Sequence, residues 1–169
     1  MLRKQLLIAL GMVAAVAVCL LAARHAMGRH SAAGMATADR LALAWRWLLV
    51  PGLCLLAGIG STANQRFLRA DAIDGGAAKG PGFLEINLRY NTNTLEQTVL
   101  AVIAWTGLAL NLAPQNLGLI PTLAGLFAAG RVAFWIGYLY APWARAFGLG
   151  LTAYPTFFVL AWLAVRLIA

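Results

Sequence analysis

Six polar residues in the second half of the chain could do chemistry together. They form two groups, the first of Arg89, Asn93 and Glu96 and the second of Arg131, Tyr138 and Arg145. Guanidinium groups bind anions, a carboxylate binds a cation, and a phenol both donates and accepts hydrogen bonds. Such side chains around an apolar-walled cleft suit a ligand that is anionic and partly apolar.

The first group has the spacing of one helix face. Arg89, Asn93 and Glu96 are spaced i, i+4, i+7. On a helix that turns about 100° per residue, they fall within about 60° of one another. Glu96 would then lie roughly 10 Å further along the helix than Arg89. A carboxylate at that depth in a membrane is costly, so we expect it to face the bundle and meet a partner.

The second group is spaced by seven residues. Arg131, Tyr138 and Arg145 make one stripe if a single helix carries them, with a drift of about 20° per step. Pro142 interrupts the pattern before the last step. Arg131 lies inside a long apolar run, and we expect it to pair with Glu96. That pair could simply hold helices together, or the two groups could build a polar cavity open at one end, and the residues leave both alternatives open.

The composition indicates the element type that must position these residues. Of the 169 residues, 62% are hydrophobic and 11% are charged, whereas a soluble domain carries about 25% charge. The chain is therefore predicted to be an all-α integral membrane protein without a separate soluble domain. The net charge is +8, but most basic residues lie between apolar runs, where they meet lipid headgroups. We expect membrane lipid, and no nucleic acid, as their partner.

Five apolar runs predict five helices, because backbone groups in lipid must be satisfied within their own segment. The runs cover residues 5–23, 41–63, 95–112, 117–140 and 146–169, and one or two polar helical turns from Glu85 precede the third. Each holds about 18–24 residues, which suffices to cross a hydrocarbon core of ~30 Å. The short break at 111–116 makes the third and fourth runs antiparallel neighbours.

The first run follows Arg3 and Lys4, as the apolar part of a signal peptide would. It is long for a signal peptide and no small-x-small cleavage site follows, so we expect a retained membrane helix. Tyr90 is expected in an aromatic belt at the membrane interface. Cys19 and Cys54 are expected to be small buried hydrophobes, and the sequence predicts no metal site.

The Lys and Arg distribution favours a cytoplasmic N-terminus, by seven basic residues against five. The cytoplasmic set is Arg3, Lys4, Arg66, Arg69, Lys79, Arg89 and Arg145. The opposite set is Arg24, Arg29, Arg40, Arg46 and Arg166. Arg89 and Arg145 then lie at the cytoplasmic end of the bundle.

The first group resembles the signature of the MAPEG family, the membrane-associated proteins of eicosanoid and glutathione metabolism. The second helix of that family begins with Arg-x-x-x-Asn-x-x-Glu, which here is Arg89, Asn93 and Glu96.

The run at 117–140 is similar to the family's third helix, with Arg131, Phe134 and Tyr138 at i, i+3 and i+7. The leukotriene synthase branch carries a catalytic arginine seven residues after that tyrosine, and Arg145 holds this place. Phe134 replaces the hydroxyl or imidazole often found at its position.

The resemblance is to a bacterial-type member, and it implies a four-helix membrane domain at 41–169 that assembles as a homotrimer. Residues 1–40 would be an additional N-terminal transmembrane helix and basic linker. Glutathione would lie between adjacent subunits near the cytoplasmic side. It would be bound by Arg89, Asn93, Glu96, Arg131 and Tyr138. Arg145 would be the catalytic residue that faces the thiol.

The expected function is that of a membrane-bound glutathione transferase or peroxidase, in a bacterial inner membrane with its site facing the cytoplasm. Glutathione is the co-substrate, and its activated thiol attacks a lipophilic electrophile. A non-catalytic bundle of the same fold, which binds a lipid or acts in assembly, is the alternative. A transporter subunit is less favoured, because the paired broken helices of such sites are missing from the sequence pattern.

Overall fold

The computed structural model describes residues 1–28, 34–75 and 82–168, and in these ranges the chain is helical with no strands. The helices are α1 (Leu2–Ala26), α2 (Thr37–Phe67), α3 (Phe83–Asn111), α4 (Leu119–Tyr140) and α5 (Ala146–Ile168), with a short 3-10 helix at Pro114–Asn116. The predicted all-α membrane bundle is confirmed. Arg29 and Lys79, which entered the charge comparison, lie outside the described residues.

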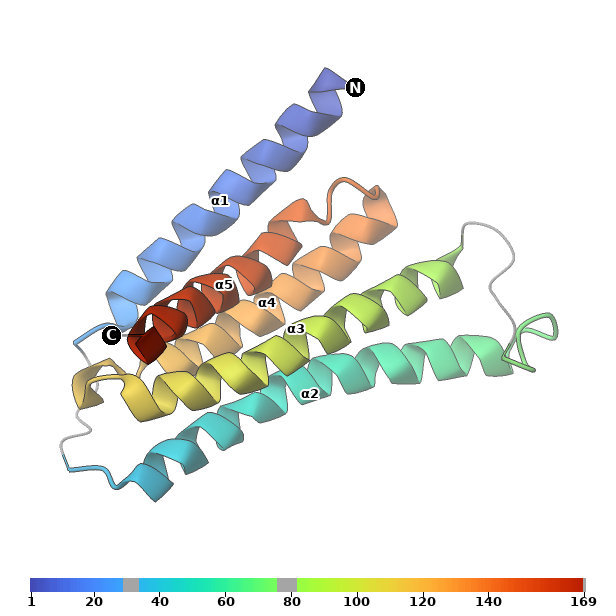
Figure 1. The fold of residues 1–169 in the computed structure, drawn as a ribbon. Coiled ribbons are helices and arrows are strands. Elements are labelled where there is room, and N and C mark those ends of the chain that lie inside the picture. The colour runs from blue at the N-terminus through green and yellow to red at the C-terminus, as the bar shows by residue number, and fades with distance from the viewer. Residues whose placement is uncertain (29–33, 76–81, 169) are drawn as a thin grey trace.

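Within the described residues, four helical segments are long and apolar enough to cross a membrane, namely α1, α2, Pro114–Tyr140 and α5. α3 has 29 residues but is not among them. Its first half carries charged and amide side chains, including Arg89, Asn93 and Glu96. Figure 1 shows α3 lying beside α2 along most of their lengths. The chain is therefore a multi-pass membrane protein in which α3, the long helix without such an apolar stretch, packs along α2.

Successive helices run antiparallel, so one end of the bundle gathers the starts of α1, α3 and α5 and the ends of α2 and α4 (Figure 1). We call it the Arg89 end, because Arg89 lies near the start of α3. α1 leans against α5 and diverges from the other helices toward its N-terminus. The expected antiparallel pairing of the third and fourth runs is confirmed.

An apolar core joins α2, α3 and α4 in the half of the bundle away from the Arg89 end. The rings of Trp105 and Phe127, each 1% exposed, meet edge to face with their centroids 6.2 Å apart. Around them are buried alanines, Ala44, Ala101, Ala104, Ala109 and Ala124. Small side chains let membrane helices approach closely, so contact between backbones contributes to this core.

Two glycines bring α4 and α5 into close contact. A Cβ on Gly130 would lie 2.9 Å from the carbonyl oxygen of Gly148, and a Cβ on Gly148 would lie 2.6 Å from that of Gly130. Neither position has room for a side chain. The close approach places Arg131, the residue after Gly130, directly beside α5.

α2 and α3 also meet at a glycine. A Cβ on Gly58 would lie 2.6 Å from the ring of Tyr90, whose hydroxyl donates to the carbonyl of Cys54 at 3.1 Å. Tyr90 is 4% exposed. Its predicted place in an interfacial aromatic belt is therefore wrong. The ring lies between the helices instead, where the absence of a side chain on Gly58 leaves space for it.

We expect Gly58→Ala to lower the thermal unfolding midpoint in detergent, because overpacking at a tight contact costs about 1–3 kcal/mol. Gly60→Ala is the matched control, since a Cβ there meets nothing within 4 Å. It should leave the midpoint unchanged or raise it slightly through the better helix propensity of alanine. Equal midpoints for the two variants would contradict the described α2–α3 contact.

Candidate functional site

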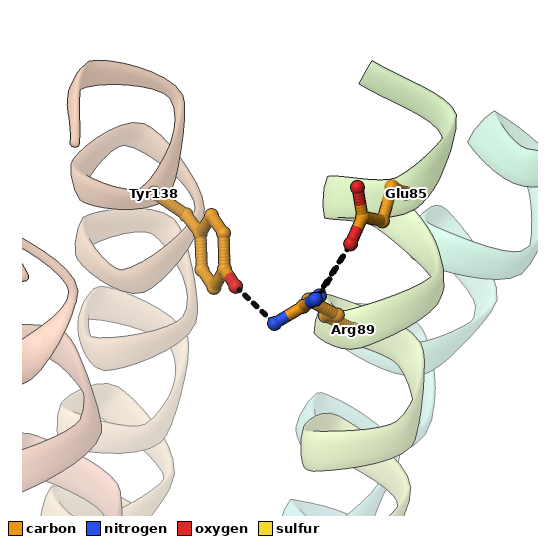
Figure 2. Close-up of polar contacts among 3 residues, drawn as sticks. All are labelled: Glu85, Arg89 and Tyr138. Atoms are coloured by element: carbon orange, nitrogen blue, oxygen red, sulfur yellow. Dashed lines mark hydrogen bonds and ion pairs between the residues drawn. The ribbon is translucent and has the colours of Figure 1, made fainter. Parts of the chain in front are cut away.

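Arg89 connects α3 to α4 at the Arg89 end. Its guanidinium forms an ion pair with Glu85, with Nη2 2.6 Å and Nε 3.0 Å from Oε1. Nη1 donates to the hydroxyl of Tyr138 at 3.2 Å, as Figure 2 shows. Glu85 was not singled out from the sequence, although its i, i+4 spacing from Arg89 is the usual spacing of helical ion pairs.

Arg145 also lies beside Tyr138, and a turn of the chain brings it there. α4 ends at Tyr140 and residues 141–145 form a turn before α5, so the interruption expected at Pro142 is observed and the helical stripe does not extend to Arg145. The turn folds back against α4, where a Cβ on Gly137 would lie 2.6 Å from the carbonyl oxygen of Ala144. The Arg145 guanidinium consequently lies 4.8 Å from the centre of the Tyr138 ring. Tyr138 thus contacts Arg89 with its hydroxyl and Arg145 with its face.

Arg131 is 1% exposed and connects three helices. From α4, its Nη1 donates to Oδ1 of Asn93 on α3 at 2.7 Å, and its Nη2 donates to Oγ1 of Thr152 on α5 at 2.6 Å. The guanidinium also lies 4.8 Å from the ring centre of Phe134. The aromatic residue that departs from the family pattern therefore packs against the buried charge.

The expected Arg131–Glu96 pair is wrong. Among the described residues no ion pair joins them, and Glu96 is exposed on the outer side of α3. Glu96 projects about 60° further around the helix than Asn93, which is enough to turn it away from α4. The amide of Asn93, not the carboxylate, meets the buried guanidinium.

The structure brings four of the six predicted residues to one open crevice of ≈310 Å³. The crevice is lined by Leu88, Arg89, Thr92, Asn93, Glu96 and Arg145. The other two predicted residues contact this lining. Tyr138 touches both Arg89 and Arg145, and Arg131 donates to Asn93. Within the described ranges, the side chains of Glu96 and Arg145 have no hydrogen-bond or ion-pair partner. Both charges are therefore available to a ligand.

Asn87 is a further polar anchor that the sequence did not reveal. Its Nδ2 donates to Oγ of Ser61 at 2.8 Å, and its Oδ1 accepts from Nε1 of Trp135 at 2.8 Å. It thereby joins α2, α3 and α4. The described residues contain no group of three or more His, Cys, Asp or Glu side chains that could hold a metal ion.

Comparison with known proteins gives a partial match. No protein-family model and no solved structure matches the chain. Transmembrane protein 79 of Mus musculus is 32% identical over 79 residues, which is 47% of this chain and 20% of the relative. Transmembrane protein 79 of Bos taurus matches to the same extent. The match spans about a fifth of these relatives' length, and their names agree with a membrane location.

We expect Thr152→Val to lower the thermal unfolding midpoint, because it leaves a buried guanidinium N–H without its acceptor at a cost of about 1–3 kcal/mol. Thr156→Val is the control, since Thr156 is also buried on α5 but donates only to the Thr152 carbonyl. The midpoint of the control should change much less. A Thr152→Val protein as stable as the unmodified chain would show that Arg131 does not depend on this contact.

Proposed function

We propose that this chain is a membrane-bound glutathione transferase, or a peroxidase of the same type, with a site like that of the MAPEG family. The observation that supports this most is the convergence of Arg89, Asn93, Glu96 and Arg145 on one crevice at one end of the bundle. These are the positions that match the family pattern, and they come from two separate elements of the chain.

The charges of the crevice suit glutathione, which carries two carboxylates, an ammonium group and a thiol. Arg89 offers a guanidinium to a carboxylate, and Glu96 offers a carboxylate to the ammonium group. Because Oδ1 of Asn93 accepts from Arg131, its amide NH₂ is left to donate into the crevice. Two residues outside the crevice lining act as positioning residues. Arg131 holds the Asn93 amide, and Tyr138 contacts Arg89 and Arg145.

Arg145 is placed to stabilise a thiolate. A free thiol has a pKa of about 8.5, and each unit of lowering requires about 1.4 kcal/mol of preferential interaction with the thiolate. A guanidinium stays protonated in such a site and can supply this. The thiol proton leaves to water, and a sulfur lone pair forms a C–S bond with an electrophilic carbon. The leaving group departs with its electron pair, or an alkene electron pair moves to an adjacent carbonyl and takes up a proton.

Peroxide reduction would use the same thiolate. Sulfur attacks one peroxide oxygen, the O–O bond breaks, and the alkoxide takes up a proton to leave as an alcohol. A second glutathione thiolate then attacks the sulfenic sulfur, so that glutathione disulfide and water are released. Either electrophile is lipid-soluble and reaches the site from the bilayer.

The outer face of α3 supports assembly as a homotrimer. A line of exposed side chains runs along it from Arg89 through Glu96 to Val99 and Ile103. A carboxylate facing lipid is costly, whereas a second copy of the chain could cover it. We therefore place the glutathione crevice between subunits. The excess of basic residues supports an orientation with the Arg89 end toward the cytoplasm, and we propose a bacterial inner membrane as the location.

A second candidate is a non-catalytic bundle that uses the crevice for a lipid or for assembly. The Glu85–Arg89 ion pair favours it, because an occupied guanidinium is less available to glutathione. Calorimetry with glutathione distinguishes the two candidates. Absence of binding heat at millimolar glutathione would favour the non-catalytic candidate.

We expect glutathione mixed with the purified protein to show ultraviolet thiolate absorbance at neutral pH, and Arg145→Ala to abolish it. Arg166→Ala is the control, since Arg166 also stacks on an aromatic ring, 4.9 Å from the centre of Trp162, but lies in the last turn of α5. The control should keep the full signal. Glutathione binding without any thiolate signal in the unmodified chain would refute the activation step.

Native mass spectrometry of the full chain in detergent should give a mass three times that of the monomer. Ile103→Trp should weaken the trimer, because the added ring would project into the subunit contact. Ile136→Trp is the control, as Ile136 is also exposed but on α4, where a ring can face lipid. A monomer, or equal effects of the two variants, would overturn the proposed assembly.

A further inference from the structure

A pocket of ≈320 Å³ lies between α2 and α4, and Tyr90 of α3 also contributes to its lining. We call it the α2–α4 pocket. Leu53 of α2 and Val132 of α4 belong to the lining and are 62% and 57% exposed. Both lie well inside helices that are long and apolar enough to cross a membrane. The pocket therefore opens toward lipid, and it shares no lining residue with the crevice.

Arg131 gives the α2–α4 pocket a positive charge. It is the one charged residue among those that line the pocket. Two of its nitrogens are engaged with other helices, Nη1 with Asn93 on α3 and Nη2 with Thr152 on α5. Its Nε–H has no acceptor within the described chain, although the residue is 1% exposed. A buried N–H without an acceptor costs free energy, so a ligand that supplies an acceptor here is favoured.

Two other donors near this pocket already have acceptors. The Tyr90 hydroxyl donates to the Cys54 carbonyl at 3.1 Å, and Nε1 of Trp135 donates to Oδ1 of Asn87 at 2.8 Å. The rings of Tyr90 and Trp135 both belong to the lining, with centroids 5.6 Å apart and planes at 37°. The pocket therefore offers a ligand a buried cation with an unused N–H and two electron-rich rings.

These features suit a neutral, flat and electron-poor ring that bears a carbonyl group. A ligand that comes from lipid is neutral, because an ion would have to leave water for the hydrocarbon. A carbonyl oxygen accepts a hydrogen bond, and an electron-poor ring stacks well on Tyr90 and Trp135. The volume is near the lower end of the usual range for small-molecule sites, about 300–1,000 Å³. A single ring fits such a space.

We infer that the α2–α4 pocket binds a lipid-soluble quinone, with one carbonyl oxygen accepting a hydrogen bond from Nε of Arg131. Nε is covered by neighbouring side chains, so a small shift of the lining accompanies this bond. The tail of the quinone passes Leu53 and Val132 into the bilayer. The inference goes beyond the proposed function and does not rest on it, because quinone binding needs no glutathione and involves no electron transfer.

The test uses the full chain in lipid nanodiscs and a benzoquinone whose ring carries methyl groups and a decyl chain at every free carbon. No ring position is then left for a thiol to attack. Isotopic labelling of the carbonyl carbons separates their infrared stretching band from the bands of the protein. We expect a saturable band at lower frequency than in protein-free nanodiscs, because a hydrogen bond from a cation weakens the C=O bond. A benzene with the same alkyl groups should bind about tenfold more weakly in competition.

Two neighbouring alanines of α4 provide matched variants. Ala128→Phe should fill the pocket and weaken quinone binding about tenfold. Ala129→Phe is the control, since Ala129 is exposed and is not part of the lining, and it should bind the quinone as the unmodified chain does. Arg131→Met should abolish the low-frequency band. If Arg131→Met fails to fold, the two alanine variants and the carbonyl-free competitor decide the question.

Three outcomes would overturn the inference. They are equal quinone affinities for Ala128→Phe and Ala129→Phe, a bound quinone whose carbonyl band stays at its frequency in protein-free nanodiscs, and equal binding of the alkylbenzene. None of them bears on glutathione binding, so failure of the quinone site leaves the proposed function standing. Absence of glutathione binding would equally leave the quinone site standing.

Discussion

The hydrogen bonds of the buried Arg131 guanidinium are the constraint on which the arrangement of α3, α4 and α5 depends. A charge that is 1% exposed in a membrane bundle requires partners, because an unpaired buried charge costs several kcal/mol. Arg131 finds two neutral oxygens, on Asn93 and Thr152, which belong to different helices. Rotation of either helix by more than a fraction of a turn would break one bond. The single guanidinium therefore fixes which face of α3 points outward.

The outer crevice follows from this inner contact. With Asn93 held against Arg131, the helical period turns Arg89 and Glu96 to the outside of α3. Tyr138, about two helical turns beyond Arg131 on the same face of α4, then meets Arg89 with its hydroxyl at 3.2 Å. The polar residues thus form layers, from a buried charge through neutral groups to exposed charges. Such layering lets a membrane helix carry charged groups at its open end without leaving any charge unpartnered in its interior.

The sequence could predict the helices but not the neighbours of each helix face. The apolar runs at 117–140 and 146–169 nearly coincide with α4 and α5, because hydropathy marks the residues that lipid can surround. α3 begins at Phe83, two residues before the polar helical turns expected from Glu85, although those turns leave no hydropathy signal of their own.

Side-chain partners were harder to predict than helices. Helical angles placed Asn93 and Glu96 near one face, yet only the position of α4 decides which of them meets Arg131. A lone Thr152 in an apolar run gives no sign of its partner. Arg145 lies against the Tyr138 ring because the turn after α4 folds back, and the seven-residue spacing does not predict that reversal.

That turn gives the clearest connection between fold and chemistry. The proposed reaction between a water-soluble thiol and a membrane-soluble electrophile would require a group at the boundary between the two phases. A helical continuation of α4 would have carried Arg145 about one turn and a half beyond Tyr140, away from the packed helices. The reversal instead returns it to the Tyr138 ring at the start of α5, where α1 also passes. Because small residues such as Gly11 and Ala15 let α1 lie close to α5, an apolar wall reaches the same guanidinium that borders the polar crevice.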